Sequence, residues 1–395
     1  MYPITGVQYG FTTAIIVLFF LAVFGIGCGG DPDPDVLSSI AGGSSVSQDP
    51  SVGISAASQS PSASPESSAG ASGSSEPAVP GVYMAVILEN NAGTHDAPAY
   101  THNDTLCLLT AAADDTDGFA NAITVLGSDI YAAGSYGGKP VYWKTRLGVA
   151  AGAPIPISVN DGETYAMRII RSGGQETMYF AGNEGSDACY WKIVNGGAPV
   201  KTTLAPGIAY SLFVESQGGS ETLHIAGGND SAGSGFYWNG TSAQFVNAYT
   251  LFSVFVKGST VYLAGEPNDV WGGFWYGGSS FTYIGIDEAY LENVIYVDSL
   301  DRIYVGGDHD RGGIYRYSSV SDADPVGLIP PTAANNAWVC DIAEAGGSIY
   351  AAGSWDALGT DQGHACYWKD EVLIHQFTEP AGYAYSYATG IFVVP

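Results

Sequence analysis

Ile130-Tyr131-Ala132-Ala133-Gly134, followed after a short loop by Tyr142-Trp143-Lys144, is the stretch that decides the fold. Seven recognisable copies of this pair of segments lie along the chain. A unit repeated at a steady spacing specifies an architecture, because each copy supplies the same small element and stacks on the next. It specifies no chemistry, so the fold is more predictable from this chain than the ligand is.

The length of the repeat identifies the architecture. Measured between the residues that anchor the first segment, successive copies lie 48, 48, 45, 38, 42 and 46 residues apart. Repeats of about 40–50 residues with short strands and glycine turns are typical of β-propeller blades. The sequence therefore predicts an all-β, seven-bladed propeller. The anchors are Tyr83, Tyr131, Tyr179, His224, Tyr262, Tyr304 and Tyr350.

Each unit is expected to contain four strands. In the third copy, residues 166–171 and 177–181 alternate in polarity on either side of a glycine turn at 172–175. The Tyr-Trp segment supplies a third strand, and a weaker stretch such as 154–159 supplies the fourth. Adjacent Tyr and Trp side chains point to opposite faces of a strand, so each blade offers a large aromatic residue to both neighbours. The Ala-Ala-Gly positions are expected where wedge-shaped blades narrow toward the axis.

The two ends of the repeat region are incomplete in complementary ways. Residues 82–87 match the second strand of the other units, with no first strand in front of them. Residues 384–394 match a first strand and follow the last unit. We therefore expect 388–394 to pair beside 82–86 and close the ring, which would remove exposed sheet edges.

The first 27 residues do not fit the repeat. Residues 14–24 form an unbroken apolar run, and Gly25-Ile26-Gly27-Cys28 follows it. This resembles the signal peptide and lipobox of bacterial lipoproteins, and the resemblance implies cleavage before Cys28 and lipidation of its thiol. Residues 1–13 contain no Lys or Arg, unlike the usual basic start of a signal. An ordinary secretion signal and an uncleaved membrane anchor remain the alternatives.

Residues 28–80 are expected to form a disordered tether. The stretch is rich in Ser, Ala, Gly and Pro, and such a composition buries little apolar surface. A chain of this length has a mean reach of about 40 Å. The predicted domains are thus a signal peptide (1–27), a tether (28–80) and a propeller (81–395). Gly29 lacks the aspartate that retains lipoproteins in the inner membrane of enteric bacteria, so we expect a lipid anchor in the outer membrane of a bacterial envelope.

The charge of the chain limits its partners. It has 39 acidic and 12 basic residues, for a net charge of −27, and no Lys or Arg precedes Lys139. Nucleic acid is an unsuitable partner, because its phosphates would be repelled. Membrane contact is expected only through the lipid, and the domain is expected to be a monomer that the acidity keeps soluble.

Four cysteines follow Cys28. Two of them precede Tyr-Trp at equivalent places in distant units, so they cannot reach each other at disulfide distance. No Cys-x-x-Cys spacing indicates a metal or redox pair. We expect all four to be small buried apolar residues: Cys107, Cys189, Cys340 and Cys366.

Acidic residues gather in the loops between the second and third strands and in the loops that join units, such as the loop with Asp161 and Glu163. Both kinds of loop share one face of a propeller. Oxygen ligands in this number could hold Ca²⁺. The stretch Asp114-Asp115-Thr116-Asp117-Gly118 lacks the EF-hand spacing, however, so the sequence fixes no metal site and implies no other cofactor.

The same face is the predicted contact surface, because aromatic residues flanked by polar groups suit protein or glycan recognition. Tyr136, Trp271 and Trp355 are expected to be loop aromatic residues outside the strand pattern. The full candidate set is Tyr136, Asp187, Asp230, Asp269, Trp271, Asp308, His309, Asp310, Trp355 and Asp361.

No catalytic motif is evident. The chain lacks a Gly-x-Ser-x-Gly elbow, a His-Glu-x-x-His helix and a phosphate-binding glycine loop. Gly227-Gly228, which precedes Tyr237-Trp238, and Gly306-Gly307, which precedes Tyr315-Arg316, look faintly like kelch repeats. The chain resembles more closely uncharacterised bacterial secreted and lipid-anchored propellers built on Ala-Gly and Tyr-Trp repeats.

We therefore expect a binding or scaffold module for a protein or a glycan, without catalytic residues. One alternative is a glycan hydrolase or lyase, which would need paired carboxylates about 5–10 Å apart. Another is an accessory component of outer-membrane protein assembly.

Overall fold

The computed structural model describes residues 76–110, 116–217, 220–229, 233–268, 272–286, 289–309, 313–322, 326–327, 335–357, 363–370 and 372–395. All of them belong to one compact unit, Ser67–Pro395. These residues form strands and no helix, which confirms the predicted all-β class. Within these ranges there is accordingly no helical segment with the length and hydropathy of a membrane span. The predicted signal, Cys28 and the tether as far as residue 75 lie outside the described residues.

The strands are short and antiparallel. In chain order they are β1 (Gly81–Asn90), β2 (Asp96–His102), β3 (Thr105–Leu108), β4 (Gly118–Leu126), β5 (Asp129–Tyr136), β6 (Lys139–Thr145), β7 (Ile155–Pro156), β8 (Gly162–Ser172), β9 (Gln175–Glu184), β10 (Asp187–Val194), β11 (Val200–Pro206), β12 (Ile208–Gln217), β13 (Ser220–Gly228), β14 (Phe236–Trp238), β15 (Ala243–Phe245), β16 (Thr250–Lys257), β17 (Thr260–Glu266), β18 (Gly273–Gly277), β19 (Phe281–Gly285), β20 (Ala289–Val297), β21 (Ile303–His309), β22 (Ile314–Tyr317), β23 (Val326–Gly327), β24 (Asn335–Ala345), β25 (Ser348–Ala357), β26 (His364–Lys369), β27 (Val372–Gln376) and β28 (Tyr383–Val394).

Hydrogen bonds join these strands into five sheets, three with four strands and two with eight. The eight-stranded sheets each consist of two four-stranded groups that meet through a single residue pair, Gly228 with Thr250 in one and Asp308 with Trp338 in the other. We number the four-stranded groups in chain order. They are β28-β1-β2-β3 (first), β4–β7 (second), β8–β11 (third), β12–β15 (fourth), β16–β19 (fifth), β20–β23 (sixth) and β24–β27 (seventh).

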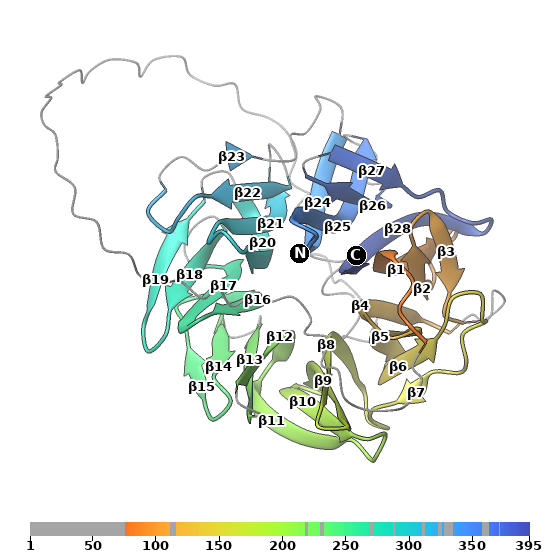
Figure 1. Cartoon of the computed structure of the whole chain (residues 1–395), viewed down its shortest axis with the longest axis horizontal. Coiled ribbons are helices and arrows are strands. Elements are labelled where there is room, and N and C mark those ends of the chain that lie inside the picture. Colours follow the sequence, from red (N-terminus) through yellow and green to blue (C-terminus); the bar gives the residue numbers. More distant parts are fainter. Residues whose placement is uncertain are drawn as a thin grey trace, which may run out of the picture. The chain divides into compact units, whose positions relative to one another are not determined.

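The groups follow one another around a common centre in a propeller-like arrangement (Figure 1). Each core cluster of buried apolar side chains lies between two consecutive groups, and one such cluster joins the seventh group to the first. The apolar core of the unit is therefore divided among the contacts between groups. Every group depends on its two neighbours to cover its faces.

The repeated aromatic residues lie as the strand alternation predicts. Trp143 packs in the cluster shared with the first group, and Tyr142 packs in the cluster shared with the third. Trp191, the equivalent of Trp143 in the next copy, is 1% exposed. The predicted contribution of one large aromatic side chain to each neighbour is confirmed for these copies.

The chain ends are paired as predicted. Val82 lies opposite Val393 and Val86 lies opposite Ala388, so β28 is the inner strand of the first group. Side chains reinforce this seam on both sides. Asp341 Oδ2 in the seventh group accepts a hydrogen bond of 2.9 Å from the Ile391 amide, and Thr389 Oγ1 donates to the Ala120 carbonyl in the second group at 2.6 Å. The last strand is thus bound to three groups at once.

The glycine that recurs in the repeated segment has a different structural role from the one expected. The inner strand of each group carries a β-bulge opposite the second strand, where one residue is skipped in the register. A Cβ on Gly134 would lie 1.8 Å from the Phe119 carbonyl oxygen, and one on Gly182 would lie 1.9 Å from that of Glu163. The glycine therefore makes room for the bulged backbone, not for a neighbouring blade. The skipped residues are Asn121, Tyr165, Tyr210, Phe252, Asn293, Cys340 and Thr389.

This arrangement predicts the effect of a single methyl group. Gly182→Ala is expected to lower the free energy of unfolding by at least about 2 kcal/mol, because overpacking against a fixed backbone costs this order of energy. Gly152→Ala is the matched control, since no heavy atom lies within 4 Å of its Cβ position. Urea unfolding of both variants measures the difference, and equal midpoints would contradict the role of the bulge.

Candidate functional site

The structure describes only part of the predicted contact surface. Tyr136, Asp187 and Trp355 have described side chains, whereas Asp308 and His309 are described by their backbone in β21 alone. These positions lie in the second and third strands of their groups, at or near the strand ends. Asp187 is exposed. The other members of the set lie outside the described residues: Asp230, Asp269, Trp271, Asp310 and Asp361.

Two of the predicted loop aromatic residues are strand residues. Tyr136 ends β5 and packs edge-on against the repeat tryptophan Trp143, with ring centroids 6.5 Å apart. Trp355 lies within β25 and packs against Trp368 at 6.2 Å. The prediction that they stand outside the strand pattern is therefore wrong. They lie on different sheets from each other and from Asp187.

The metal and cysteine predictions have different outcomes. Among the described residues no group of three or more His, Cys, Asp or Glu side chains is placed to hold a metal ion. The four cysteines after Cys28 are free, and Cys189 and Cys366 are buried as predicted. Cys107 and Cys340 are only half-buried, and Cys340 occupies a bulge of the inner strand.

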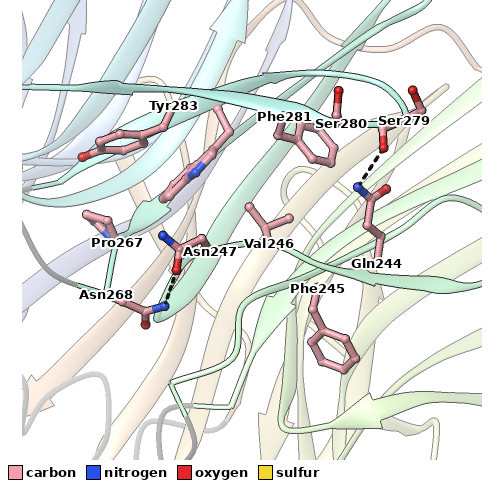
Figure 2. Close-up of a pocket in the computed structure, with 11 residues that line it drawn as sticks. Gln244, Phe245, Val246, Asn247, Pro267, Asn268, Ser279, Ser280, Phe281 and Tyr283 are labelled. Carbon is pink, nitrogen blue, oxygen red and sulfur yellow. Dashed lines mark hydrogen bonds between the residues drawn. The ribbon is translucent and has the colours of Figure 1, made fainter.

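A groove between the fourth and fifth groups is a candidate site formed by described residues. It has a volume of about 540 Å³ and is partly open to solvent. One wall comes from β15 and the residues that follow it, and the other comes from the outer strands β18 and β19 with their turn (Figure 2). Its volume lies in the range of small-molecule sites. The lining residues are Gln244, Phe245, Val246, Asn247, Pro267, Asn268, Trp275, Ser279, Ser280, Phe281 and Tyr283.

Aromatic side chains form the wall contributed by the fifth group. Phe281 and Tyr283 are two positions apart on β19, so both point to the same face of the strand. Tyr283 packs against Trp275 at 4.9 Å, and Phe281 packs edge-on against Tyr237 of the fourth group at 5.5 Å. Phe245, by contrast, points away from the other labelled side chains (Figure 2). The wall is thus fixed by packing before any ligand arrives.

Hydrogen-bonding groups occupy the remaining surface of the groove. Gln244 Nε2 donates to the Ser279 carbonyl at 3.3 Å, and Asn268 Nδ2 donates to Asn247 Oδ1 at 3.0 Å. Both bonds connect the fourth group to the fifth. Together with Ser280 these residues present amides and hydroxyls, which both donate and accept hydrogen bonds.

The groove differs in charge from the rest of the molecule. None of its described lining residues is acidic or basic, although the chain carries a net charge of −27. Several basic residues are used elsewhere by the repeat itself. Lys144, Lys192 and Lys369 follow the Tyr-Trp pairs, and each ammonium group lies 5.0–5.2 Å from the ring centroid of an anchor tyrosine. The groove offers a charged ligand no counter-charge among its described lining residues, and the net negative charge of the chain repels anions.

The sequence analysis missed this groove, because it lies on the outer strands that carry the weakest repeat signal. One pattern could have indicated it. The alternation Phe281-Thr282-Tyr283 places two aromatic residues on a fourth strand, whereas the other described outer strands contain no such pair. A departure of one unit from the common repeat is a better indicator of a site than the repeat itself.

One acidic residue expected in an exposed loop is buried. Glu163 lies in β8 at 8% exposure and accepts a hydrogen bond of 2.6 Å from Asn121 Nδ2 of the second group. Tyr165 donates to its other oxygen at 3.2 Å. Burial raises the pKa of Glu163 to about 7, although these hydrogen bonds favour the charged form. Glu163 is therefore a titratable contact between two groups, whereas its neighbour Asp161 is exposed and paired with Lys139 at 2.5 Å.

Comparison with known proteins gives limited similarity. No protein-family model matches the sequence, and a search of curated proteins finds no match. Solved structures with a similar chain path include a candidate 6-phosphogluconolactonase from Bacteroides fragilis, at a TM-score of 0.46 and 9% identity over 79% of this chain and 98% of that one. A triple arginine-to-alanine variant of AofleA from Arthrobotrys oligospora has a TM-score of 0.35 and 10% identity over 64% and 88%. A prolyl endopeptidase structure has a TM-score of 0.39 and 9% identity over 74% and 50%. At these identities no functional residue of these proteins can be assigned to a position in this chain.

The buried carboxyl predicts a pH dependence of stability. Because the pKa of Glu163 is raised in the folded state, its protonation stabilises the fold fully below about pH 4.5, and this contribution is lost as the pH rises through about 7. Asp96 acts in the same direction, since burial, Glu89 and Asp117 raise its pKa to about 7. We expect the melting temperature of the wild-type protein to decrease as the pH is raised from 5 to 8.

Glu163→Gln isolates the first contribution, because the amide keeps the size of the side chain and cannot ionise. Over the same pH range the unfolding free energy of the variant should decrease less than that of wild type. The two decreases should differ by up to about 3 kcal/mol. Thermal or urea unfolding at several pH values provides the comparison. Parallel pH profiles of the two proteins would show that Glu163 does not titrate in this range.

Proposed function

We propose that the folded unit is a seven-bladed β-propeller in which each four-stranded group is one blade. Under this proposal the two eight-stranded sheets are each a pair of blades. The single residue pair that joins each pair of groups supports it, as does the apolar cluster at each junction. The anchor residues of the repeat also lie on the second strand of their groups, one to each group.

We further propose that the protein is a non-catalytic binding module for an uncharged glycan, and that the groove between the fourth and fifth groups is its site. The observation that carries the proposal is the lining itself, in which aromatic rings face amides and hydroxyls without a charged side chain. The C–H face of a sugar ring packs on an aromatic ring, and its hydroxyls pair with groups that both donate and accept. The acidity around the groove keeps anionic competitors away.

The described lining residues favour binding over the alternatives. Glycoside hydrolysis needs two carboxyl groups on opposite sides of the bond, and the groove offers none among these residues. A protein partner remains a second candidate for the loop surface with Asp187, which is exposed. No feature of the groove supports a role in outer-membrane protein assembly. Co-purification with that machinery would test this role.

The cellular setting is also a proposal. The resemblance of residues 1–28 to a lipoprotein signal supports cleavage before Cys28 and an anchor in the outer membrane. The tether would then hold the domain within about 40 Å of the bilayer surface. A binding module in this place would act on glycans of the envelope or its surroundings, as a monomer and without contact to nucleic acid.

Co-sedimentation with insoluble envelope polysaccharide tests the binding function. We expect the full chain, purified in detergent, to sediment with the polysaccharide. At a low protein concentration, the fraction of the double variant Phe281→Ala/Tyr283→Ala that sediments should be at least ten-fold smaller than for wild type, because the variant lacks the aromatic wall. Thr282→Ala is the control, since this exposed residue points to the other face of β19.

The same incubation separates binding from catalysis. The polysaccharide is analysed by chain length after prolonged contact with the protein, and we expect no change. Release of shorter fragments by wild type would support the hydrolase or lyase alternative. Equal sedimentation of wild type and the double variant, both folded by thermal melting, would remove the groove as the glycan site.

A further inference from the structure

The groove has two defined ends. Gln244 reaches across to the Ser279 carbonyl at one end, and Asn268 reaches across to Asn247 at the other. Figure 2 shows these two hydrogen bonds on opposite sides of the site, with Val246 and Phe281 between them. Each bond joins the fourth group to the fifth, so the distance between the ends is held by the packing of the two groups. A groove with fixed ends selects ligands by length.

The end groups retain capacity for a ligand. After its contact with Ser279, Gln244 keeps its carbonyl oxygen as an acceptor. After their mutual contact, Asn268 keeps its carbonyl oxygen and Asn247 keeps its amide donors. Each end can therefore exchange hydrogen bonds with a hydroxyl group. These carboxamides carry no charge, so they bind a hydroxyl without favouring a carboxylate or an ammonium group.

The volume of the groove gives the length of the occupant. A cavity of about 150 Å³ accommodates benzene, and a pyranose ring with its hydroxyls is larger, so the 540 Å³ of the groove hold at most about three sugar rings. The aromatic wall is consistent with this length. Phe281 and Tyr283 are two residues apart on one face, which places their positions about 6.8 Å apart along the strand. Two consecutive sugar rings can thus each meet an aromatic side chain.

We propose that the groove binds a neutral oligosaccharide of two to three pyranose units, whose rings pack along Phe281 and Tyr283 and whose end hydroxyls bond to Gln244 and to the Asn247–Asn268 pair. The inference rests on the proposed glycan-binding function and adds the size and charge of the ligand. A single sugar fills one third of the site and reaches one end only. A charged sugar has no counter-ion among the described lining residues, and the net charge of −27 repels uronic acids.

Titration calorimetry with defined sugars tests the length and the charge. The full chain in detergent is titrated with glucose, mannose, galactose and N-acetylglucosamine series of one to four units, and with galacturonic acid oligomers of the same lengths. For at least one neutral series we expect affinity to rise ten-fold or more from one unit to three, and to rise no further at four. Uronic acid oligomers of three units should bind at least ten-fold more weakly than the best neutral trimer.

Variants at the ends provide the structural control. Asn268→Ala or Gln244→Ala should reduce the gain in affinity between two and three units. Thr282→Ala should match wild type throughout, and thermal melts confirm that each variant is folded. The inference is overturned if a monosaccharide alone reaches the full affinity, if affinity keeps rising beyond three units, or if uronic acids bind best.

The result also separates this inference from the function on which it rests. If envelope polysaccharide sediments with the protein through Phe281 and Tyr283, but no neutral oligomer of any series binds, the size and charge of the ligand are wrong and the glycan-binding function stands. If neither the polysaccharide nor any oligomer binds, both proposals fail together.

Discussion

The pairing of β28 with β1 is the constraint on which the rest of the structure depends. It brings residues at opposite ends of the folded unit into one sheet, with Gly81 opposite Val394 and Asn90 opposite Tyr383. Each group of strands has apolar side chains on both faces, so an open arrangement would leave two faces in water. Closure covers both at once. The groove between the fourth and fifth groups depends on it indirectly, because its two walls belong to neighbouring groups whose positions the ring fixes.

The β-bulge of the inner strand recurs in every group with side chains of different chemistry. Every group has a bulge at the same place, and the facing residue is the repeat glycine in six groups and Val86 in the first. The bulged residue itself varies. In the first and second groups Thr389 and Asn121 use this position to hydrogen-bond to the next group. In the third to fifth groups Tyr165, Tyr210 and Phe252 pack against one another in sequence, with centroids 5.1 Å apart and the rings inclined at 63° and 58°. The contact between consecutive groups is preserved while its chemical nature changes.

Much of this fold could be predicted from the sequence, because the periodic features of a repeat occur in several copies. The strand order, the opposite directions of Tyr142 and Trp143 and the closing strand all follow from alternation and from the incomplete first unit. The bulge could not be predicted, since its signal is a glycine that also fits a crowded axis. Tyr136 and Trp355 were misplaced for a related reason. An aromatic residue just beyond the repeated segment extends the strand when it finds a tryptophan to pack against, and sequence spacing does not show that contact. The groove was missed because single-copy features, such as the two aromatic residues of β19, have no second copy to draw attention to them.

The measurement that tests the central claim most directly is the unfolding of a chain that ends at Gly382 and therefore lacks β28. If the groups form one closed and mutually dependent ring, the shortened protein loses the single cooperative urea transition of the parent or shows it at a much lower urea concentration. Its tryptophan emission shifts toward that of exposed indole. A shortened protein that unfolds in one transition at the midpoint of the parent would contradict closure as the basis of the fold.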